Sequence, residues 1–372
     1  MNKLKMVATC MLGIEGLLAN ELRFMNAENV VAENGRVFFE GDQSILARAN
    51  IRSRFAERIL IVMGMFKALT FEQLFENVKA IDWAEIIGKD DRFPVSGRSL
   101  SSKLASIPDC QKIIKKAIVE KLSSRYRQSY FEETGIMYQI RFLILKDQVT
   151  VMIDTSGTGL HKRGYRAVSN DAPIKETLAA ALVDLSRVRS NHTVYDPFCG
   201  SGTILIESAM KAMNIAPGLK RSFISESWHI APNIWRNERN LAESEIIHNC
   251  DFHAYGSDID QDALNIALAN AEKAGVSKKI TLEKADIKDF KTLGDYATVI
   301  CNPPYGERLL NQNEALKIYS VMGERFIKKP HHSYTIISPE DDFEKSFGRS
   351  ADKHRKLYNG MIPCQVYMYF KS

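Results

Sequence analysis

Short apolar runs alternate with amphipathic segments through the carboxyl-terminal half of the chain. The apolar runs, which are typical of buried strands, lie at 193–195, 254–258, 280–283, 297–301 and 334–338. Helical patterns are expected at about 203–213, 261–274 and 315–328, and the second of them should stop at Gly275. This alternation predicts a doubly wound α/β domain with a mainly parallel sheet, and the turn at 359–360 predicts a terminal hairpin.

The amino-terminal half has a different order of elements. Strand-like and helical segments are expected at 5–9, 13–24, 36–40 and 43–49, then at 59–63, 71–87, 136–145 and 149–154. The last two join through a polar turn, which predicts an α+β domain with an antiparallel sheet. A domain boundary is expected near 155–170. The segment 216–250 interrupts the later alternation and is either structural cover or a wall of a substrate site.

Composition places the chain among ordinary globular proteins. Its 372 residues suit two or three domains, and 45% apolar and 26% charged residues are average values. No apolar run of about 18 residues and no signal-like segment occurs, so a cytoplasmic protein without membrane attachment is expected. The six cysteines are spread singly, which argues against a metal site and against disulfides.

The net charge of +5 hides a local basic segment. Between residues 98 and 127, basic residues outnumber acidic ones by six. The expected helix at 109–125 has apolar side chains on one side and Lys112, Lys115 and Lys116 on the other. Such a row can follow the phosphates of a nucleic acid, although a solvated helix face is an equally good interpretation.

The sequence Asn302-Pro303-Pro304-Tyr305 follows the apolar run 297–301. It should therefore lie at the carboxyl end of a strand, where open α/β sheets bind ligands. Asn302 provides a side-chain carbonyl, Pro303 a backbone carbonyl and Tyr305 a flat ring. Two acceptors and a stacking surface suit a planar base with an exocyclic amine. A turn that only ends the strand is the alternative.

Three acidic residues follow the preceding strands. Asp196 opens the loop 196–202, whose glycines let the backbone approach a ligand, while Leu205 stands where a dinucleotide-binding motif has its third glycine. Asp196 could accept hydrogen bonds from an ammonium group, Asp258 from ribose hydroxyls and Asp286 from an adenine amine. The set favours S-adenosylmethionine as the cofactor, although each acid alone could be a helix cap or turn former.

Four segments together make the chain resemble the THUMP-domain class I methyltransferases, in particular bacterial guanine-N2 methyltransferases of 23S ribosomal RNA, also described as predicted adenine-N6 DNA methylases. They are 157–166, 172–181, 196–207 and 302–309. The resemblance implies a ferredoxin-like α+β unit at 1–55, a THUMP RNA-binding domain at 56–157 and a Rossmann-like class I methyltransferase domain at 158–372. It also implies 23S ribosomal RNA or a precursor as the partner, and no feature calls for an obligatory protein partner.

The resemblance also implies roles for individual residues. The methionine part of the cofactor would lie on the loop residues Asp196, Pro197, Phe198, Gly200 and Gly202. Its ribose would bind Asp258 and its adenine Asp286, while Lys175, Glu176 and Thr177 would lie beside the methionine end. The candidate RNA contacts are the three lysines above together with Arg163 and Arg308, and the catalytic positions are Asn302, Pro303 and Tyr305.

The expected reaction is a direct methyl transfer. Accepting both amine hydrogens on Asn302 and Pro303 would aim the guanine N2 lone pair at the methyl group. No protein nucleophile is needed, so Cys199 and Cys301 are interpreted as small buried residues. Two other functions stay open. They are adenine-N6 methylation of DNA, because the motif recognises an amine and not one base, and a noncatalytic role as an RNA-binding assembly factor.

Overall fold

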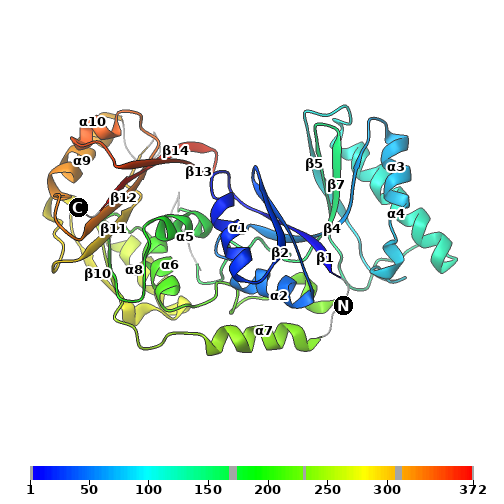
Figure 1. The fold of residues 1–372 in the computed structure, drawn as a ribbon, viewed down its shortest axis with the longest axis horizontal. Helices are drawn as coiled ribbons and strands as arrows, with labels where there is room; N and C mark the ends of the chain where they lie inside the picture. Colours follow the sequence, from blue (N-terminus) through cyan, green and yellow to red (C-terminus); the bar gives the residue numbers. More distant parts are fainter. Residues whose placement is uncertain (1–2, 167–173, 229–231, 306–311, 371–372) are drawn as a thin grey trace.

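The computed structural model describes residues 3–166, 174–228, 232–305 and 312–370. It has two seven-stranded sheets, one in each half of the chain, with helices packed on them (Figure 1). The predicted order, an α+β amino-terminal half followed by an α/β domain, is confirmed.

The carboxyl-terminal sheet is doubly wound, with the order β10-β9-β8-β11-β12-β14-β13, and its first five strands are parallel. The strands are β8 (Thr193–Asp196), β9 (His253–Asp258), β10 (Ile280–Lys284), β11 (Ala297–Cys301), β12 (His332–Ser338), β13 (Lys353–Asn359) and β14 (Ile362–Tyr369). The helices are α5 (Glu176–Leu185), α6 (Thr203–Ala212), α8 (Gln261–Ala274), α9 (Gln312–Arg325) and α10 (Phe343–Phe347). Each apolar run predicted to be a strand is one, and α8 ends at Gly275 in the left-handed conformation, as predicted.

The strand order creates a place for a ligand between β8 and β11. The chain leaves β8 toward β9 on one side and later returns to β11 on the other side. Loops that follow such strands diverge and leave a crevice at their carboxyl ends. Thr298 pairs with Val194 and Val299 with Tyr195, which places Asp196 opposite Ile300. Asn302 follows two residues after Ile300, so it lies at the same edge of the sheet as Asp196.

The amino-terminal sheet has the order β2-β3-β1-β4-β7-β6-β5. Its strands are β1 (Leu4–Thr9), β2 (Glu28–Glu33), β3 (Arg36–Gly41), β4 (Arg58–Lys67), β5 (Val95–Leu100), β6 (Ile140–Leu145) and β7 (Gln148–Asp154). Its helices are α1 (Glu15–Phe24), α2 (Gln43–Arg52), α3 (Phe71–Lys79) and α4 (Ile107–Tyr126). The predicted antiparallel sheet is present except at one edge, where β5, which was not predicted, pairs in parallel with β6.

Strand β4 joins the two amino-terminal units into one sheet. Residues 58–61 pair with β1, and β7 pairs with β4 from Leu60 to Lys67. The pairing with β7 shifts by one residue between Val62 and Gly64, just past the last pair with β1. Such a bulge bends a strand and increases its twist, so the sheet changes direction between its two halves.

The described part of the insertion at 216–250 packs against the amino-terminal half, as structural cover would, and its alternative role as a wall of a substrate site stays a prediction. It contains α7 (Pro232–Ser244), which packs along α2 (Figure 1). Arg48 of α2 donates two hydrogen bonds to Glu238 of α7, at 2.9 and 2.7 Å. Just before α7, Trp228 stacks on Tyr138, with ring centroids 4.8 Å apart. The insertion therefore holds the two halves of the molecule together.

Within the described part of the chain, every helix is too short or too polar to span a lipid bilayer. All six cysteines are free.

Candidate active site

The loop that follows β8 combines a buried acid with two glycines. Asp196 is only 1% exposed, and its Oδ1 accepts a hydrogen bond from the Phe198 N–H at 3.1 Å. Burial, together with the charge of Asp258, raises the pKa of Asp196 to about 8. A carboxyl group in this state would become a stable carboxylate if a cation came to lie beside it.

The two glycines of this loop have different roles. Both have positive φ, +48° at Gly200 and +79° at Gly202, which other residues rarely adopt. A Cβ on Gly202 would lie 3.0 Å from the Ala267 Cβ, so this glycine allows α8 to pack against the loop. A Cβ on Gly200 would meet nothing within 4 Å, so open space lies beside this backbone. That space, at the start of α6, is where a ligand can approach the chain.

Asp258 and Asp286 lie at the ends of the two neighbouring strands. Asp258 Oδ2 accepts a hydrogen bond from Gly200 N at 2.9 Å, which fixes the loop to the end of β9. The next strand is tied to the same place, because Ala285 N donates to the Asp258 carbonyl at 3.1 Å. Asp286 accepts from Lys288 N at 2.9 Å and so caps a short 3₁₀ helix at 287–289. Asp286 is therefore a helix cap in this structure, and its side chain is partly exposed, with the other carboxylate oxygen 3.6 Å from Lys288 Nζ.

Asn302 follows β11 and carries an unsatisfied acceptor. Its Oδ1 is buried and has no hydrogen-bond partner among the described residues. Leaving a buried acceptor unpaired costs about 1–3 kcal/mol, so such atoms are rare in proteins and often belong to ligand sites. The following Pro303 is buried as well. Asn302 therefore offers an acceptor at the same sheet edge as Asp196.

Tyr305 is held by Asn359, for which the sequence pattern predicts no role in the site. The Tyr305 hydroxyl accepts a hydrogen bond from Asn359 Nδ2 at 2.6 Å, and burial of most of the side chain raises the pKa of Tyr305 well above the usual range. Asn359 ends β13, and the sequence pattern predicts it only as part of a hairpin turn. The β13–β14 hairpin thus fixes the direction of the ring. Stacking of Tyr305 on a base stays a prediction.

Lys175, Glu176 and Thr177 have structural contacts with distant residues, which a local sequence pattern does not predict. Thr177 Oγ1 donates to Glu57 Oε1 at 2.7 Å, and Lys175 Nζ lies 3.7 Å from the same carboxylate, at the start of β4. Glu176 is buried and lies 3.6 Å from Arg166, whose Nη2 donates to Thr203 Oγ1. The three residues therefore link the amino-terminal half to the first residue of α6, next to the glycine loop.

The interpretation of Arg163 as an RNA contact is wrong. The side chain is 3% exposed and donates to the carbonyls of Leu160 and Arg54, at 2.7 and 2.5 Å. Glu207, which is fully buried, lies 3.6 Å away. Arg163 is thus an interior residue that joins the two halves.

The predicted lysine row on α4 is reduced from three members to two. Lys112 and Lys116 are exposed, as expected. Lys115 instead pairs with Glu133, donates to the Phe93 carbonyl at 3.1 Å and lies 3.5 Å from the centroid of the Phe93 ring. It is therefore a structural residue. Arg308 lies outside the described residues.

The described residues include no group of three His, Cys, Asp or Glu side chains that could hold a metal ion. Cys199 and Cys301 are 5% and 0% exposed, and burial raises the pKa of both thiols. A thiol in this state is a poor nucleophile. The described part of the site thus offers acceptors and open backbone, and its two thiols are not activated.

Three regions of the chain match known protein families. The RlmL ferredoxin-like domain matches residues 5–60, the THUMP domain matches 68–154, and the RMKL-like methyltransferase domain matches 163–368, which is more than half of the chain. The chain belongs to the RMKL-like methyltransferase family. The family resemblance drawn from the sequence is therefore confirmed.

Relatives similar over the whole chain support this assignment. A Bacillus subtilis protein, YpsC, provisionally named an RNA methyltransferase, is 44% identical over 100% of this chain and 97% of its own. A predicted N6-adenine-specific DNA methylase from Listeria monocytogenes is 43% identical, with a TM-score of 0.95 over 100% of this chain and 97% of that one. SMU.472, provisionally a methyltransferase, was solved with SAH, the demethylated form of S-adenosylmethionine. It is 41% identical, with a TM-score of 0.94 over 100% and 99% of the two chains. The predicted cofactor is thereby confirmed for the family.

Proposed function

We propose that this chain transfers a methyl group from S-adenosylmethionine to the exocyclic N2 of a guanine in 23S ribosomal RNA or its precursor. The observation that carries the proposal is the buried Oδ1 of Asn302, which has no hydrogen-bond partner among the residues that the structure describes and lies at the same sheet edge as the Asp196 loop. An acceptor kept unpaired in the protein is available for an amine of the substrate.

The residues around the loop fit the proposed cofactor. Asp196 would accept hydrogen bonds from its ammonium group, Asp258 from its ribose hydroxyls and Asp286 from its adenine amine. The open space beside Gly200 leaves room for the methionine part. The SAH complex of SMU.472, which is 41% identical, supports the same assignment.

The bound cofactor would supply an electrophilic methyl group on its sulfonium. The guanine amine is a poor nucleophile because its lone pair is delocalised into the ring. Asn302 Oδ1 and the Pro303 carbonyl would accept its two hydrogens, favour a pyramidal nitrogen and direct the lone pair. The anchored Tyr305 ring would stack on the base after it has left its helix.

The THUMP match and the provisional name of YpsC favour RNA as the substrate. The choice of guanine and of 23S ribosomal RNA rests on the family resemblance. The Listeria relative is described as an adenine-specific DNA methylase, and two acceptors would suit an adenine amine equally well. Adenine-N6 methylation of DNA is therefore the second candidate.

The test is transfer of labelled methyl groups from S-adenosylmethionine to ribosomal RNA and to DNA from a strain that lacks the gene. Nucleoside mass spectrometry of both products then identifies the base. We expect N2-methylguanine in RNA, and a loss of at least about a hundredfold in kcat for Asn302→Ala. Asp196→Ala should lose cofactor binding, while Asn240→Ala, an exposed asparagine on α7, should keep full activity. N6-methyladenine in DNA alone, or full activity of Asn302→Ala, would overturn the proposal.

A further inference from the structure

The two faces of the amino-terminal sheet are unlike each other. On one face, Met6, Phe39 and Phe142 belong to the core cluster that also holds Leu18 of α1 and Ile114 of α4. The opposite face has a small apolar cluster of its own, made of Val7, Leu60 and Met152 with Phe38, Val62 and Leu143 around them. The helices α1 and α4 therefore lie on one face, and the other face, called here the open face, carries a separate apolar strip.

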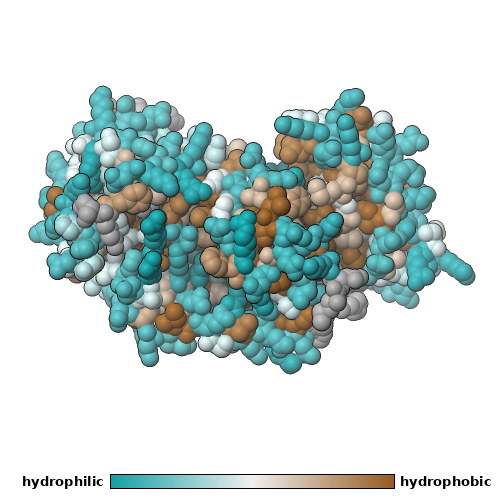
Figure 2. Space-filling model, in the orientation of Figure 1, coloured by the Kyte–Doolittle hydropathy of each residue, from teal (hydrophilic) through white to brown (hydrophobic). Residues whose placement is uncertain are grey.

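Strand register aligns this strip across the sheet. Val7 pairs with Phe38 on one side and with Leu60 on the other, and Val62 pairs with Met152. Paired residues point to the same side of a sheet, so the strip runs from β3 across β1 and β4 to β7. The bulge in β4 bends the sheet along this line. Figure 2 shows a hollow at the upper edge between the two halves of the sheet, with hydrophobic side chains on its walls.

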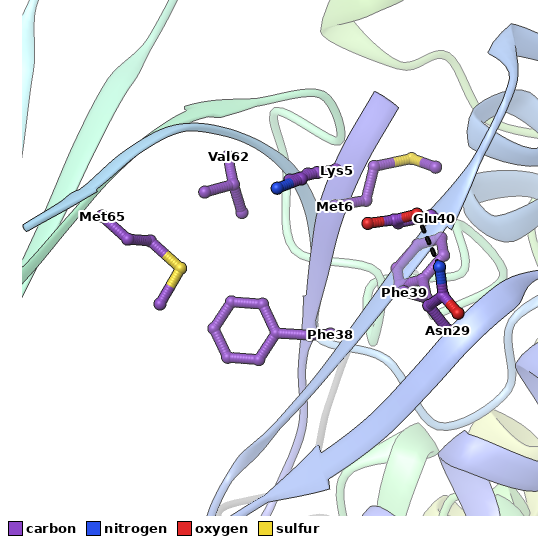
Figure 3. Close-up of a pocket in the computed structure, with 8 residues that line it drawn as sticks. All are labelled: Lys5, Met6, Asn29, Phe38, Phe39, Glu40, Val62 and Met65. Atoms are coloured by element: carbon purple, nitrogen blue, oxygen red, sulfur yellow. Dashed lines mark hydrogen bonds between the residues drawn. The ribbon is translucent and has the colours of Figure 1, made fainter. Parts of the chain in front are cut away.

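A cavity of about 110 Å³ opens on this face. In Figure 3 the ring of Phe38 and the side chain of Met65 extend to the same side as Val62 and Lys5. Met65 is 57% exposed, and Phe38 is partly exposed. The Arg36 guanidinium lies 4.8 Å from the centroid of the Phe38 ring. The cavity thus combines an accessible aromatic ring with cationic neighbours.

Polar groups for a base edge lie in the same cavity. Asn29 Nδ2 donates to Glu40 Oε2 at 2.7 Å. Lys5 lies opposite Glu40 on the neighbouring strand, without an ion pair between them. The cavity therefore presents carboxylate, amide and ammonium groups within reach of one another (Figure 3). Such a set can bind the donors and acceptors of a nucleobase edge.

The open face carries unpaired positive charge. Its basic residues, by register, are Lys5, Arg36, Arg58, Lys67, Arg98 and Arg141, and its acidic residues are Glu28, Glu33, Glu40 and Asp154. Glu28 pairs with Lys3. Asp154 is shared by Arg58 and Arg141, and Glu33 pairs with Arg36. Among the described residues, no carboxylate pairs with Lys5, Lys67 or Arg98. These three cations are therefore free to bind an anion.

We propose that the open face binds an unpaired stretch of the substrate RNA, with a base stacked on Phe38 and phosphates on Lys5, Lys67 and Arg98. Single-stranded RNA is bound by surfaces that combine aromatic rings with rows of cations. The three free cations complement the phosphates of RNA, and the neighbouring aromatic ring offers a stacking surface for a base, so the combination favours RNA. This inference rests on the proposed RNA substrate, and it assigns RNA binding to the face opposite Lys112 and Lys116 of α4.

The test measures binding of the full-length protein to a fluorescein-labelled, single-stranded RNA of 12 nucleotides by fluorescence anisotropy. Phe38→Leu keeps an apolar side chain but removes the ring, and we expect its affinity to fall roughly fivefold or more. Phe38→Tyr should bind like the wild type. Phe24→Leu is the matched control, because Phe24 is 89% exposed at the end of α1. Thermal melting shows that each variant is folded.

Charge is tested separately through the salt dependence of the same binding. The double variant of Lys5→Gln and Arg98→Gln should reduce the slope of log K against log salt by roughly 0.7 for each lost contact. The Lys112→Gln and Lys116→Gln double variant should change the slope little. Unchanged binding in Phe38→Leu and in the Lys5 and Arg98 variant, with a loss in the α4 variant, would overturn the proposal.

Failure of this inference can be distinguished from failure of the proposed function. Asn302→Ala should bind the RNA probe like the wild type and yet fail to methylate, whereas Phe38→Leu should raise KM for RNA and keep kcat and the cofactor Kd. If no RNA is methylated but the probe responds to Phe38→Leu, the binding face stands and the activity is wrong. If methylation is found and Phe38→Leu leaves KM unchanged, the binding face is wrong.

Discussion

Cofactor affinity should depend on pH through Asp196. This carboxyl is buried next to Asp258, and its pKa is raised to about 8. In the free protein it is therefore mostly protonated at neutral pH. The proposed ligand brings an ammonium group, which needs the carboxylate form. Binding should thus be coupled to release of one proton.

The size of the effect follows from the pKa. With a pKa of about 8, roughly one Asp196 in a hundred is ionised at pH 6 and about half at pH 8. The apparent affinity for the ligand should therefore weaken roughly fiftyfold, or by about 2.3 kcal/mol, when the pH is lowered from 8 to 6. At higher pH the ammonium group of the ligand loses its own proton, so the affinity should pass through an optimum and then weaken again. The stability of the free protein should depend on pH in the opposite direction, since the stabilising contribution of Asp196 falls as the pH rises. Because the folded pKa lies above the unfolded value of 3.8, this group's contribution is complete below about pH 4 and is lost as the pH rises through about 8.

The measurement is isothermal titration calorimetry with SAH, which has the same ammonium group, from pH 6 to pH 9 in buffers of different ionisation enthalpy. The buffers report the number of protons released. Asp196→Asn should bind weakly and with a flat pH profile. Asp262→Asn, which changes an exposed carboxylate at the start of α8, should keep the wild-type profile. A wild-type Kd that stays constant from pH 6 to pH 9 would refute the reasoning.

Two further predictions concern contacts on either side of the site. Asn359→Ala removes the donor that holds the Tyr305 hydroxyl, and we expect kcat to fall roughly tenfold at an unchanged cofactor Kd, with Asn265→Ala as the control. Burial alone would raise the pKa of Glu57, but hydrogen bonds from His161 and Thr177 outweigh it and lower the pKa to about 2. Its contribution is therefore present above about pH 4.5 and is lost as the pH falls through about 2. Glu57→Gln should lower the free energy of unfolding, measured in urea at pH 7, by about 3 kcal/mol. This difference should shrink toward pH 2. Equal stabilities of the variant and the wild type at pH 7 would contradict the assignment.

The parts of the site that could be predicted depend on local sequence pattern. Each acid follows a short apolar run, and the order of these runs along the chain predicts that their carboxyl ends meet at one sheet edge. The left-handed end of α8 at Gly275 is likewise a local property of glycine. Asp196, Asp258 and Asn302 could therefore be placed from the sequence.

Burial of charged side chains could not be predicted, because it depends on partners far away in the chain. Arg163 lies in a basic segment that resembles an RNA contact, yet its partner is the carbonyl of Arg54. Lys115 fits the helical spacing of Lys112 and Lys116, but it forms an ion pair with Glu133 and is therefore not available as a member of the row. Nothing within either segment distinguishes a cation that faces solvent from one that faces another domain.

Of the elements that the pattern did not predict, which also include β2 and α10, β5 and α7 escaped prediction for different reasons. β5 contains serine, glycine and arginine and lacks apolar alternation, so pairing with β6 stabilises it. A Cβ on Gly97 would lie 2.3 Å from the Phe142 carbonyl oxygen, which explains the glycine. α7 does carry a helical pattern, with apolar residues at 234, 235, 241 and 242 after Pro232. That signal could have identified the helix, although its packing against α2 could not be inferred.

Strand β4 bears on how this protein could be divided or recombined. The ferredoxin-like match ends at residue 60 and the THUMP match begins at 68, so the boundary falls inside a strand that spans 58–67. A fragment cut there would leave either β1 or β7 with an unpaired backbone edge, and such edges promote aggregation. Exchange of one unit between relatives, in the laboratory or by recombination of genes, would therefore have to carry both units together.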